Sequence, residues 1–239
     1  KIYFDLLEQR ASKVPLQHIT GFQEFMSLPF EVGRNVLIPR QDTEILVETV
    51  INLCKKNRHE RVDILDVGTG SGCIAVSLAY YIPRSFVTAV DIKPEALAVA
   101  RKNAAINGVS DRIRFVKSNL FDNLDGEKFD FIVSNPPYIR SGDIESLQDE
   151  VKCHEPLAAL DGGIDGLDFY RAIVSKAPDF LKEEGMLVFE TGYDQAYAVK
   201  ELMKDYFMDI EIKKDLAGID RVVTGTLMPP DSESCLNKT

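Results

Sequence analysis

The chain has 239 residues, enough for one large domain with a full core, and its 45% hydrophobic and 28% charged residues are ordinary for a globular protein. A formal net charge of −10 argues against stable nucleic-acid binding, which depends on clustered Lys and Arg, and is compatible with a basic protein partner. The sequence holds no secretory signal and no apolar run long enough to span a bilayer, so we expect a cytoplasmic protein without membrane contact.

The cysteines and histidines are too scattered to form a zinc site. The four cysteines include no CxxC pair, and the three histidines lie far from one another in the sequence. We therefore expect no metal, reduced cysteines and, by default, a monomer. The sequence starts at Lys1 rather than Met, so we also expect a fragment that lacks an N-terminal part.

The N-terminal region is predicted to hold a helix, a hairpin and a second helix. Residues 1–20 open with apolar residues at helical spacing, and Pro15 is expected to end that helix. Residues 21–32 alternate apolar and polar positions around a turn at residues 27–29, which predicts a short hairpin. Acidic residues then begin a helix at residue 42, whose buried face is predicted to contain Leu46, Val50 and Leu53.

From residue 62 onward, strand and helix patterns alternate, which predicts an α/β fold with a mostly parallel sheet. The predicted strands cover residues 62–67, 86–90, 113–116, 129–133 and 185–190, and the predicted helices cover residues 73–81, 94–106, 167–181 and 195–203. The last two strands, at residues 208–212 and 221–226, have no helix between them, so we expect an antiparallel edge. Residues 228–239 are polar with two prolines, and we expect them to be disordered.

A glycine-rich turn follows the first strand of this sheet. Its sequence is Asp66-Val67-Gly68-Thr69-Gly70-Ser71-Gly72, and a predicted helix begins directly after it. Glycines at alternate positions permit a tight turn and a close approach of a ligand to the backbone. The next strand ends at Asp91, at the distance where an acidic side chain meets ribose hydroxyls. The two features together predict a nucleoside-containing ligand at the carboxyl edge of the sheet.

The spacing of the glycines separates two kinds of nucleoside cofactor. The dinucleotide fingerprint needs Gly or Ala at position 73, where the chain has Cys73. The pattern D-x-G-x-G-x-G instead resembles the S-adenosylmethionine loop of Rossmann-like methyltransferases. This resemblance implies a seven-stranded class I methyltransferase sheet with an antiparallel last strand and helices on both faces, and S-adenosylhomocysteine as the product. It also implies that Asn119 hydrogen-bonds the adenine and that Leu120 packs on its face. The implied cofactor-binding residues are Asp66, Gly68, Thr69, Gly70, Ser71, Gly72, Asp91, Ile92, Asn119, Leu120 and Asn135.

A second motif, Asn135-Pro136-Pro137-Tyr138, follows the predicted strand at residues 129–133. Proline cannot continue a strand ladder, so the chain is expected to leave the sheet there. An Asn side-chain oxygen next to a free carbonyl offers two acceptors, which suit a planar –NH₂ group. The motif resembles that of methyltransferases acting on a planar nitrogen. Such enzymes modify adenine or cytosine in nucleic acid, or the side-chain amide of glutamine.

Further segments distinguish these substrates. Residues 19–25, 36–44, 155–167 and 215–221 resemble the release-factor glutamine methyltransferases, the HemK/PrmC group. The resemblance covers nearly the whole chain except the polar tail. Two departures are Gln41-Asp42, where Pro-Glu is common, and Leu120, where an aromatic residue can occur. The resemblance implies N(5)-methylation of the glutamine in the Gly-Gly-Gln motif of peptide chain release factors. It assigns catalysis to Asn135 and Pro136, and substrate contact to those two residues with Pro137, Tyr138 and Phe25.

Two alternatives remain at this stage. An adenine-N(6) methyltransferase acting on DNA or RNA needs a basic surface and an element that extrudes the base, and the charge of −10 counts against it. A non-catalytic cofactor-binding module is disfavoured because both motifs are intact. The expected division is residues 1–20 as the end of a truncated helical domain, 21–40 as hairpin and connector, 41–227 as the methyltransferase domain, and 228–239 as the tail.

Overall fold

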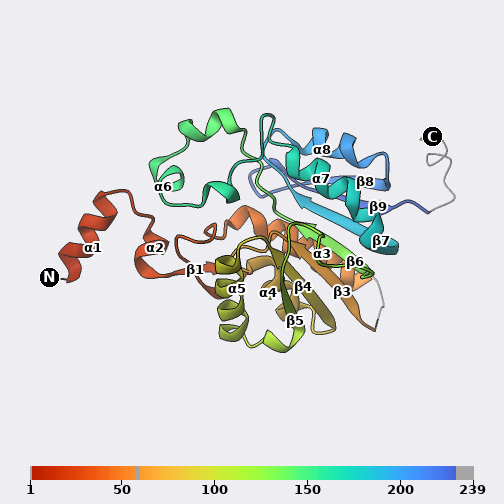
Figure 1. The fold of residues 1–239 in the computed structure, drawn as a ribbon, viewed down its shortest axis with the longest axis horizontal. Coiled ribbons are helices and arrows are strands. Elements are labelled where there is room, and N and C mark those ends of the chain that lie inside the picture. Colours follow the sequence, from red (N-terminus) through yellow and green to blue (C-terminus); the bar gives the residue numbers. More distant parts are fainter. Residues whose placement is uncertain (1, 57–59, 230–239) are drawn as a thin grey trace.

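The computed structural model describes residues 2–56 and 60–229 and contains a seven-stranded mixed sheet covered by helices on both faces (Figure 1). The strand order is β5-β4-β3-β6-β7-β9-β8, in which the first five strands are parallel and β9 pairs antiparallel with both β7 and β8. This confirms the predicted fold class. The strands are β3 (Val62–Val67), β4 (Ser85–Asp91), β5 (Ile113–Lys117), β6 (Phe129–Ser134), β7 (Leu181–Glu190), β8 (Phe207–Lys214) and β9 (Asp220–Leu227).

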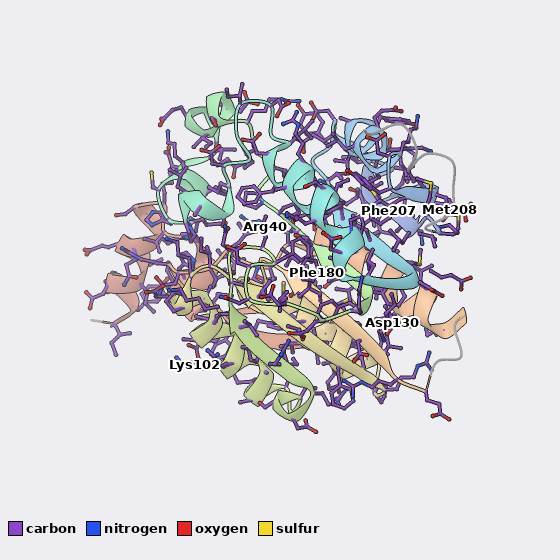
Figure 2. The ribbon with its side chains drawn as sticks, turned by 45° about the vertical axis from the view of Figure 1, so that its right-hand side comes forward. Arg40, Lys102, Asp130, Phe180, Phe207 and Met208 are labelled. Carbon is purple, nitrogen blue, oxygen red and sulfur yellow. The ribbon has the colours of Figure 1, made fainter. Side chains whose placement is uncertain are left out.

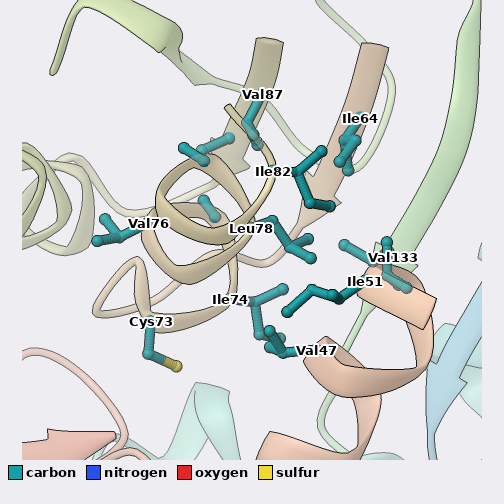
Figure 3. Packing of buried hydrophobic residues seen from close by; sticks show 14 of the residues in the cluster. Val47, Ile51, Ile64, Cys73, Ile74, Val76, Leu78, Ile82, Val87 and Val133 are labelled. Carbon is teal, nitrogen blue, oxygen red and sulfur yellow. The ribbon is translucent and has the colours of Figure 1, made fainter. Parts of the chain in front are cut away.

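Apolar clusters fill both sides of the sheet. One side is covered by α3 (Glu44–Lys56), α4 (Cys73–Tyr81) and α5 (Pro94–Ile106), and the other by α7 (Asp168–Lys176) and α8 (Ala196–Met203). Strand β8 forms one edge, where buried Phe207 is followed by the outward-facing Met208 (Figure 2). Helix α4 lies deepest, because its residues from Cys73 to Ala79 are all buried. Figure 3 shows Leu78 of α4 between α3 and the sheet, and that contact fixes the helix directly after the glycine-rich turn.

The N-terminal hairpin is part of this core. It consists of β1 (Phe22–Phe25) and β2 (Leu28–Glu31), joined by Met26 and Ser27 at φ values of 51° and 58°. The predicted turn at residues 27–29 was therefore placed too late. A left-handed two-residue turn matches the twist of paired strands, although neither residue is the usual Gly or Asn. The amide of Asn103 in α5 holds the hairpin by accepting from the Glu31 N–H at 2.7 Å and donating to the Glu31 carbonyl at 3.0 Å.

Two helices precede the hairpin, where the sequence predicted one. Helix α1 (Ile2–Ala11) ends before Pro15, and Pro15 then caps the start of α2 (Leu16–Thr20). A proline at a helix start is tolerated, because the first N–H groups of a helix lack an intrahelical partner. Helix α1 has no buried residue and projects from the body of the molecule, with an ion pair of 2.6 Å from Arg10 to Glu150 (Figure 1).

Three other details differ from the sequence prediction. The predicted helix at residues 167–181 ends at Lys176, because a 3₁₀ turn, η5 (Ala177–Phe180), contains Pro178. Strand β7 therefore begins at Leu181 rather than at residue 185. In α3, Leu53 is only half-buried, and Val47, Ile51 and Cys54 complete the buried face with Leu46 and Val50.

The connection from β6 to α7 is long and mostly irregular. It contains α6 (Asp149–Lys152) and the 3₁₀ turns η3 (Ser141–Ser146) and η4 (Leu157–Ala159). Of the predicted disordered tail, Met228 and Pro229 have no regular structure, and residues 230–239 lie outside the described residues. No helix in the described ranges is both long and apolar enough to cross a membrane.

Candidate active site

A cavity of about 720 Å³ opens at the carboxyl ends of the parallel strands. It lies where β3 has β4 on one side and β6 on the other, so the connections diverge there and leave a crevice. Four segments that are separate in the sequence and hold predicted site residues meet in its wall. The predicted site residues that line it are Gly68, Thr69, Gly70, Ser71, Asp91, Ile92, Asn119, Leu120, Asn135, Pro136 and Pro137.

The glycine-rich turn presents bare backbone to the cavity. Gly68 and Gly70 have φ values of 75° and 53°, and no atom lies within 4 Å of the position that a Cβ would take on either residue. The Gly70 N–H donates to Oδ2 of Asp91 at 2.9 Å, and the Gly68 N–H donates to the Val90 carbonyl at 2.9 Å. Asp91 therefore fixes the turn through one carboxylate oxygen and faces the same cavity.

Asp66 and Gly72, which were predicted to bind the cofactor, lie behind this wall and do not line the cavity. A Cβ on Gly72 would stand 2.9 Å from Cβ of Ala100, so this glycine permits close packing against α5. Asp66 is fully buried, and its Oδ2 accepts a hydrogen bond from the Thr69 hydroxyl at 2.6 Å. Its Oδ1 has no partner within residues 2–56 and 60–229. Burial raises the pKa of Asp66 to about 7.

The turn after β5 forms the next part of the wall. Leu120 has a φ of 50°, which is unusual for a residue with a branched side chain. The Ser118 hydroxyl donates to the Leu120 carbonyl at 2.9 Å and accepts from the Asn123 N–H at 3.2 Å. These bonds hold the turn in the conformation that exposes Asn119 and Leu120 to the cavity.

Asn135 follows β6 directly and lies beside the glycine-rich turn, which follows the neighbouring strand β3. The Ser134 hydroxyl donates to the Val67 carbonyl at 2.7 Å and joins the ends of β6 and β3. The Asn135 side-chain Nδ2 donates to Oγ1 of Thr43 at 3.1 Å, which leaves the amide oxygen as the group available to a ligand. Within the described part of the chain, the Pro136 carbonyl accepts no hydrogen bond. Both residues line the cavity, and their role as a pair of acceptors stays a prediction.

The backbone after these acceptors is held on both sides. The Ile139 N–H donates to the Leu160 carbonyl at 3.0 Å, and the Gly162 N–H donates to the Ile139 carbonyl at 2.8 Å. A Cβ on Gly162 would stand 2.7 Å from the Pro137 carbonyl oxygen, so only glycine fits there. Gln195 of the α8 N-terminus donates to the Tyr138 carbonyl at 2.9 Å. The two prolines therefore lie in a rigid segment.

Two aromatic residues predicted to contact the substrate lie elsewhere. Phe25 is 1% exposed and packs edge-on against Phe30, with ring centroids 5.9 Å apart, so it belongs to the core. Tyr138 does not line the cavity, and its hydroxyl lies 3.5 Å from Oε1 of Glu190. The ring that does line the cavity is Phe169 of α7. The sequence offered no signal for it, because its position depends on the rotation of α7.

The connector before α3 supplies residues that the sequence did not single out. Thr43 and Arg40 both line the cavity. Arg40 donates to Oε1 of Glu155 at 2.6 Å and so joins the connector to the segment at residues 155–161. Burial raises the pKa of Glu155, and the Arg40 charge opposes that rise. Both segments carried the family resemblance, but nothing in their sequence indicated that they meet.

No cluster of three or more His, Cys, Asp or Glu side chains suited to a metal ion occurs in the described ranges. A nucleoside-sized cavity lined by a bare backbone turn and by Asn135 and Pro136 suits transfer between a bound cofactor and a planar nitrogen.

Comparisons with known proteins agree with this geometry. The family described as "Methyltransferase small domain" matches residues 41–151. A release factor glutamine methyltransferase of Geobacter sulfurreducens is 46% identical over 93% of this chain and 76% of its own length. One of Clostridium acetobutylicum is 45% identical over 93% of this chain and 79% of its own length. The 16S rRNA methyltransferase RsmC of T. thermophilus, solved with AdoMet and guanosine, has a TM-score of 0.62 at 16% identity, over 87% of this chain and 50% of that chain, which shows the shared fold.

Proposed function

This chain belongs to the release factor glutamine methyltransferase family, and we propose that it transfers the methyl group of S-adenosylmethionine to the glutamine side-chain nitrogen of the Gly-Gly-Gln motif in a peptide chain release factor. The observation that carries the proposal is the pair of acceptors at Asn135 and Pro136, which face the cavity that the glycine-rich turn also lines. A –NH₂ group presents two N–H donors in one plane, so this pair of acceptors selects an amide over a hydroxyl or a carboxylate.

The cavity fits S-adenosylmethionine by its size and by its polar groups. Its volume of about 720 Å³ lies within the range of small-molecule sites. The open space beside Gly68 and Gly70 accepts the methionine part, and the Asp91 carboxylate is placed for the ribose hydroxyls. Asn119 and Leu120 then contact the adenine. When bound, the cofactor supplies a methyl group on a positively charged sulfur.

The protein's main contribution is the position of the acceptor nitrogen. An amide nitrogen is a poor nucleophile, because its lone pair is delocalised into the carbonyl. If the Asn135 oxygen and the Pro136 carbonyl hold both N–H groups, the face of the nitrogen is directed at the methyl group. Such alignment alone contributes roughly 7–11 kcal/mol in well-oriented reactions. One N–C bond forms as one S–C bond breaks, and the nitrogen then releases one proton to solvent.

The remaining expectations belong to the same proposal. The net charge of −10 favours a basic protein substrate over a nucleic acid. We assign residues 41–227 to the methyltransferase domain and residues 1–20 to the end of a helical segment that contributes to substrate contact. The hairpin at residues 21–32 shares the core of the methyltransferase domain through Phe25, Leu28 and Phe30. A cytoplasmic monomer remains our expectation.

The test is incubation with labelled S-adenosylmethionine and a purified release factor, followed by peptide mass mapping. We expect one methyl group on the glutamine of the Gly-Gly-Gln peptide. Asn135→Ala should reduce transfer by about a hundredfold or more, as loss of one preorganised hydrogen-bonding group does in other active sites, while cofactor affinity changes little. Asn52→Ala, on the exposed side of α3, is the matched control. Label on nucleic acid instead of the release factor would favour the adenine alternative.

A further inference from the structure

A buried carboxyl group lies behind the acceptor site and is not part of the proposed chemistry. Glu190 ends β7, next to β6, and the residue is 1% exposed. The Thr43 hydroxyl is close enough to this carboxyl group to favour its charged form. The same hydroxyl oxygen accepts the hydrogen bond from Nδ2 of Asn135 at 3.1 Å. Thr43 is therefore a neighbour both of Glu190 and of the residue that is proposed to bind the acceptor nitrogen.

One oxygen of the Glu190 carboxyl group still needs a donor. Oε1 accepts a hydrogen bond from the Tyr138 hydroxyl at 3.5 Å, and Oε2 has no hydrogen-bond partner within the described residues. The Tyr170 hydroxyl donates at 2.9 Å to the main-chain carbonyl of Glu190, not to its carboxyl group. A buried carboxylate needs donors, so the Thr43 O–H is expected to point at it.

The charged groups around Glu190 come from several elements. Arg221 of β9 lies near it and favours its ionised form, while Asp42 opposes that effect. Arg221 is itself paired with Asp215 at 3.3 Å and with Asp42 at 3.2 Å. Cys73 of α4 is close enough for the charge of Glu190 to contribute to the raised pKa of its thiol. Arg221 is a cation that favours the ionised form of the Glu190 carboxyl group.

The direction of these hydrogen bonds determines which end of the Asn135 amide faces the cavity. An ionised carboxylate only accepts, so Thr43 must donate to Glu190. The Thr43 oxygen then accepts from the –NH₂ group of Asn135, and the amide oxygen is left toward the cavity. If the group at position 190 could donate, Thr43 could donate to Asn135 instead. The amide would then turn and present its –NH₂ group to the –NH₂ group of the substrate.

We propose that Glu190 is a positioning residue for methyl transfer, which acts through the Thr43 hydroxyl to hold the Asn135 amide oxygen toward the acceptor nitrogen. The proposal rests on the function proposed above for Asn135. Its distinguishing feature is that Glu190 sets an orientation without touching the substrate or the cofactor. A residue that only filled the core would leave the orientation of the Asn135 amide unchanged.

Kinetics of variants test this relay. Glu190→Gln keeps the size of the side chain but adds a donor, so we expect kcat to fall by about ten- to a hundredfold while the KM for S-adenosylmethionine stays within about twofold. Thr43→Val should lower kcat by a similar factor, and Thr43→Ser should keep most of the parent kcat. The kcat of the double variant, Glu190→Gln with Thr43→Val, should be no lower than that of the slower single variant, since both changes break one relay. Thr49→Val removes a buried hydroxyl of α3 and is the control for loss of a hydroxyl.

The pH profile gives a second measurement. Burial raises the pKa of Glu190 to about 7, against the opposing effects of Thr43 and Arg221. Protonation allows the carboxyl group to donate, so kcat should fall as the pH drops through about 7, and this limb should be absent in Glu190→Gln. Asp66 has a pKa raised to about the same value, so the limb is assigned to Glu190 only if this substitution removes it.

The orientation itself is measurable without substrate. In a ¹⁵N-correlated NMR spectrum, the Asn135 side-chain amide is identified by its disappearance in Asn135→Ala. We expect this signal to be protected from exchange in the parent and to shift or lose protection in Glu190→Gln and Thr43→Val, but not in Thr49→Val. An unchanged signal in Glu190→Gln overturns the proposal, even where activity falls. Absence of methyl transfer by the parent would overturn the proposed function, and the NMR result would still decide on the relay.

Discussion

The two walls of the cavity are built in different ways. The wall at residues 67–71, 91 and 118–120 is mainly backbone, shaped by glycines and by hydrogen bonds within and between neighbouring turns. The other wall depends on side chains from distant parts of the chain, where Asn135 donates to Thr43 at 3.1 Å and the proposed relay continues to Glu190 behind them. The first wall should tolerate substitutions that leave its backbone accessible from the cavity. The second depends on the donor and acceptor direction of each side chain, so single-atom substitutions should break it.

The largest stability effect is expected at Gly72, where backbone conformation and packing both require glycine. Gly72→Ala adds a Cβ that would stand 2.9 Å from Cβ of Ala100, at a φ of 81°. Overpacking typically costs about 1–3 kcal/mol and the left-handed conformation about 1 kcal/mol more. We expect a loss of about 2–4 kcal/mol in the free energy of unfolding, measured by urea denaturation. Gly108→Ala, with a φ of 69° and no atom within 4 Å, isolates the backbone part and should lose about 1 kcal/mol.

Buried carboxyl groups should make stability depend on pH. Burial raises the pKa of Asp66 to about 7, above its unfolded value, so the folded state binds its proton more tightly. The free energy of unfolding should therefore fall as the pH rises from about 4 to about 7 and level off above that. Asp66→Asn still accepts from Thr69 and does not ionise. Above pH 7 we expect it to be more stable than the parent, by an amount on the order of a few kcal/mol.

Denaturation of the parent and of Asp66→Asn at pH 5 and pH 8 measures this difference in the free energy of unfolding. The prediction fails if the parent gains stability over this range and Asp66→Asn follows it in parallel. Glu190→Gln should show the same gain in stability above pH 7 together with its loss of activity. A gain in stability together with a loss of activity is expected where the function requires a buried charge that destabilises the fold.

The smallest expected change in stability is at the exposed side of the glycine-rich turn. Gly68→Ala introduces a Cβ into open space at a φ of 75°, so it should lose about 1 kcal/mol of stability, as Gly108→Ala does. Its effect on cofactor affinity should be larger, about tenfold or more, because Gly68 lines the cavity. Isothermal titration with S-adenosylmethionine measures this difference. Equal affinities of Gly68→Ala and the parent would show that the cofactor does not approach this backbone.

Much of the fold was predictable because its signals are local. Alternating apolar strands and amphipathic helices predicted the sheet, and the absence of a helix between the last two strands predicted the antiparallel edge. The errors lie at the ends of helices and strands, where neighbouring residues favour different structures. Pro178 stopped α7 early and let β7 start at Leu181, and Pro15 began a second helix instead of only ending the first. A single proline of this kind changes the conformation of the whole segment around it.

For the site, the sequence by itself determined the residues whose role depends on short spacing. The glycine-rich turn and the Asn-Pro-Pro-Tyr motif carry their own backbone geometry, and eleven of the predicted residues do line one cavity. Only the tertiary structure decided that Phe25 and Tyr138 do not line the cavity, that Phe169 does, and that Thr43 bonds to the Asn135 amide. The reason is physical. A turn is fixed by its own φ and ψ angles, whereas contacts between distant side chains depend on how each helix and strand is rotated and packed in the finished core.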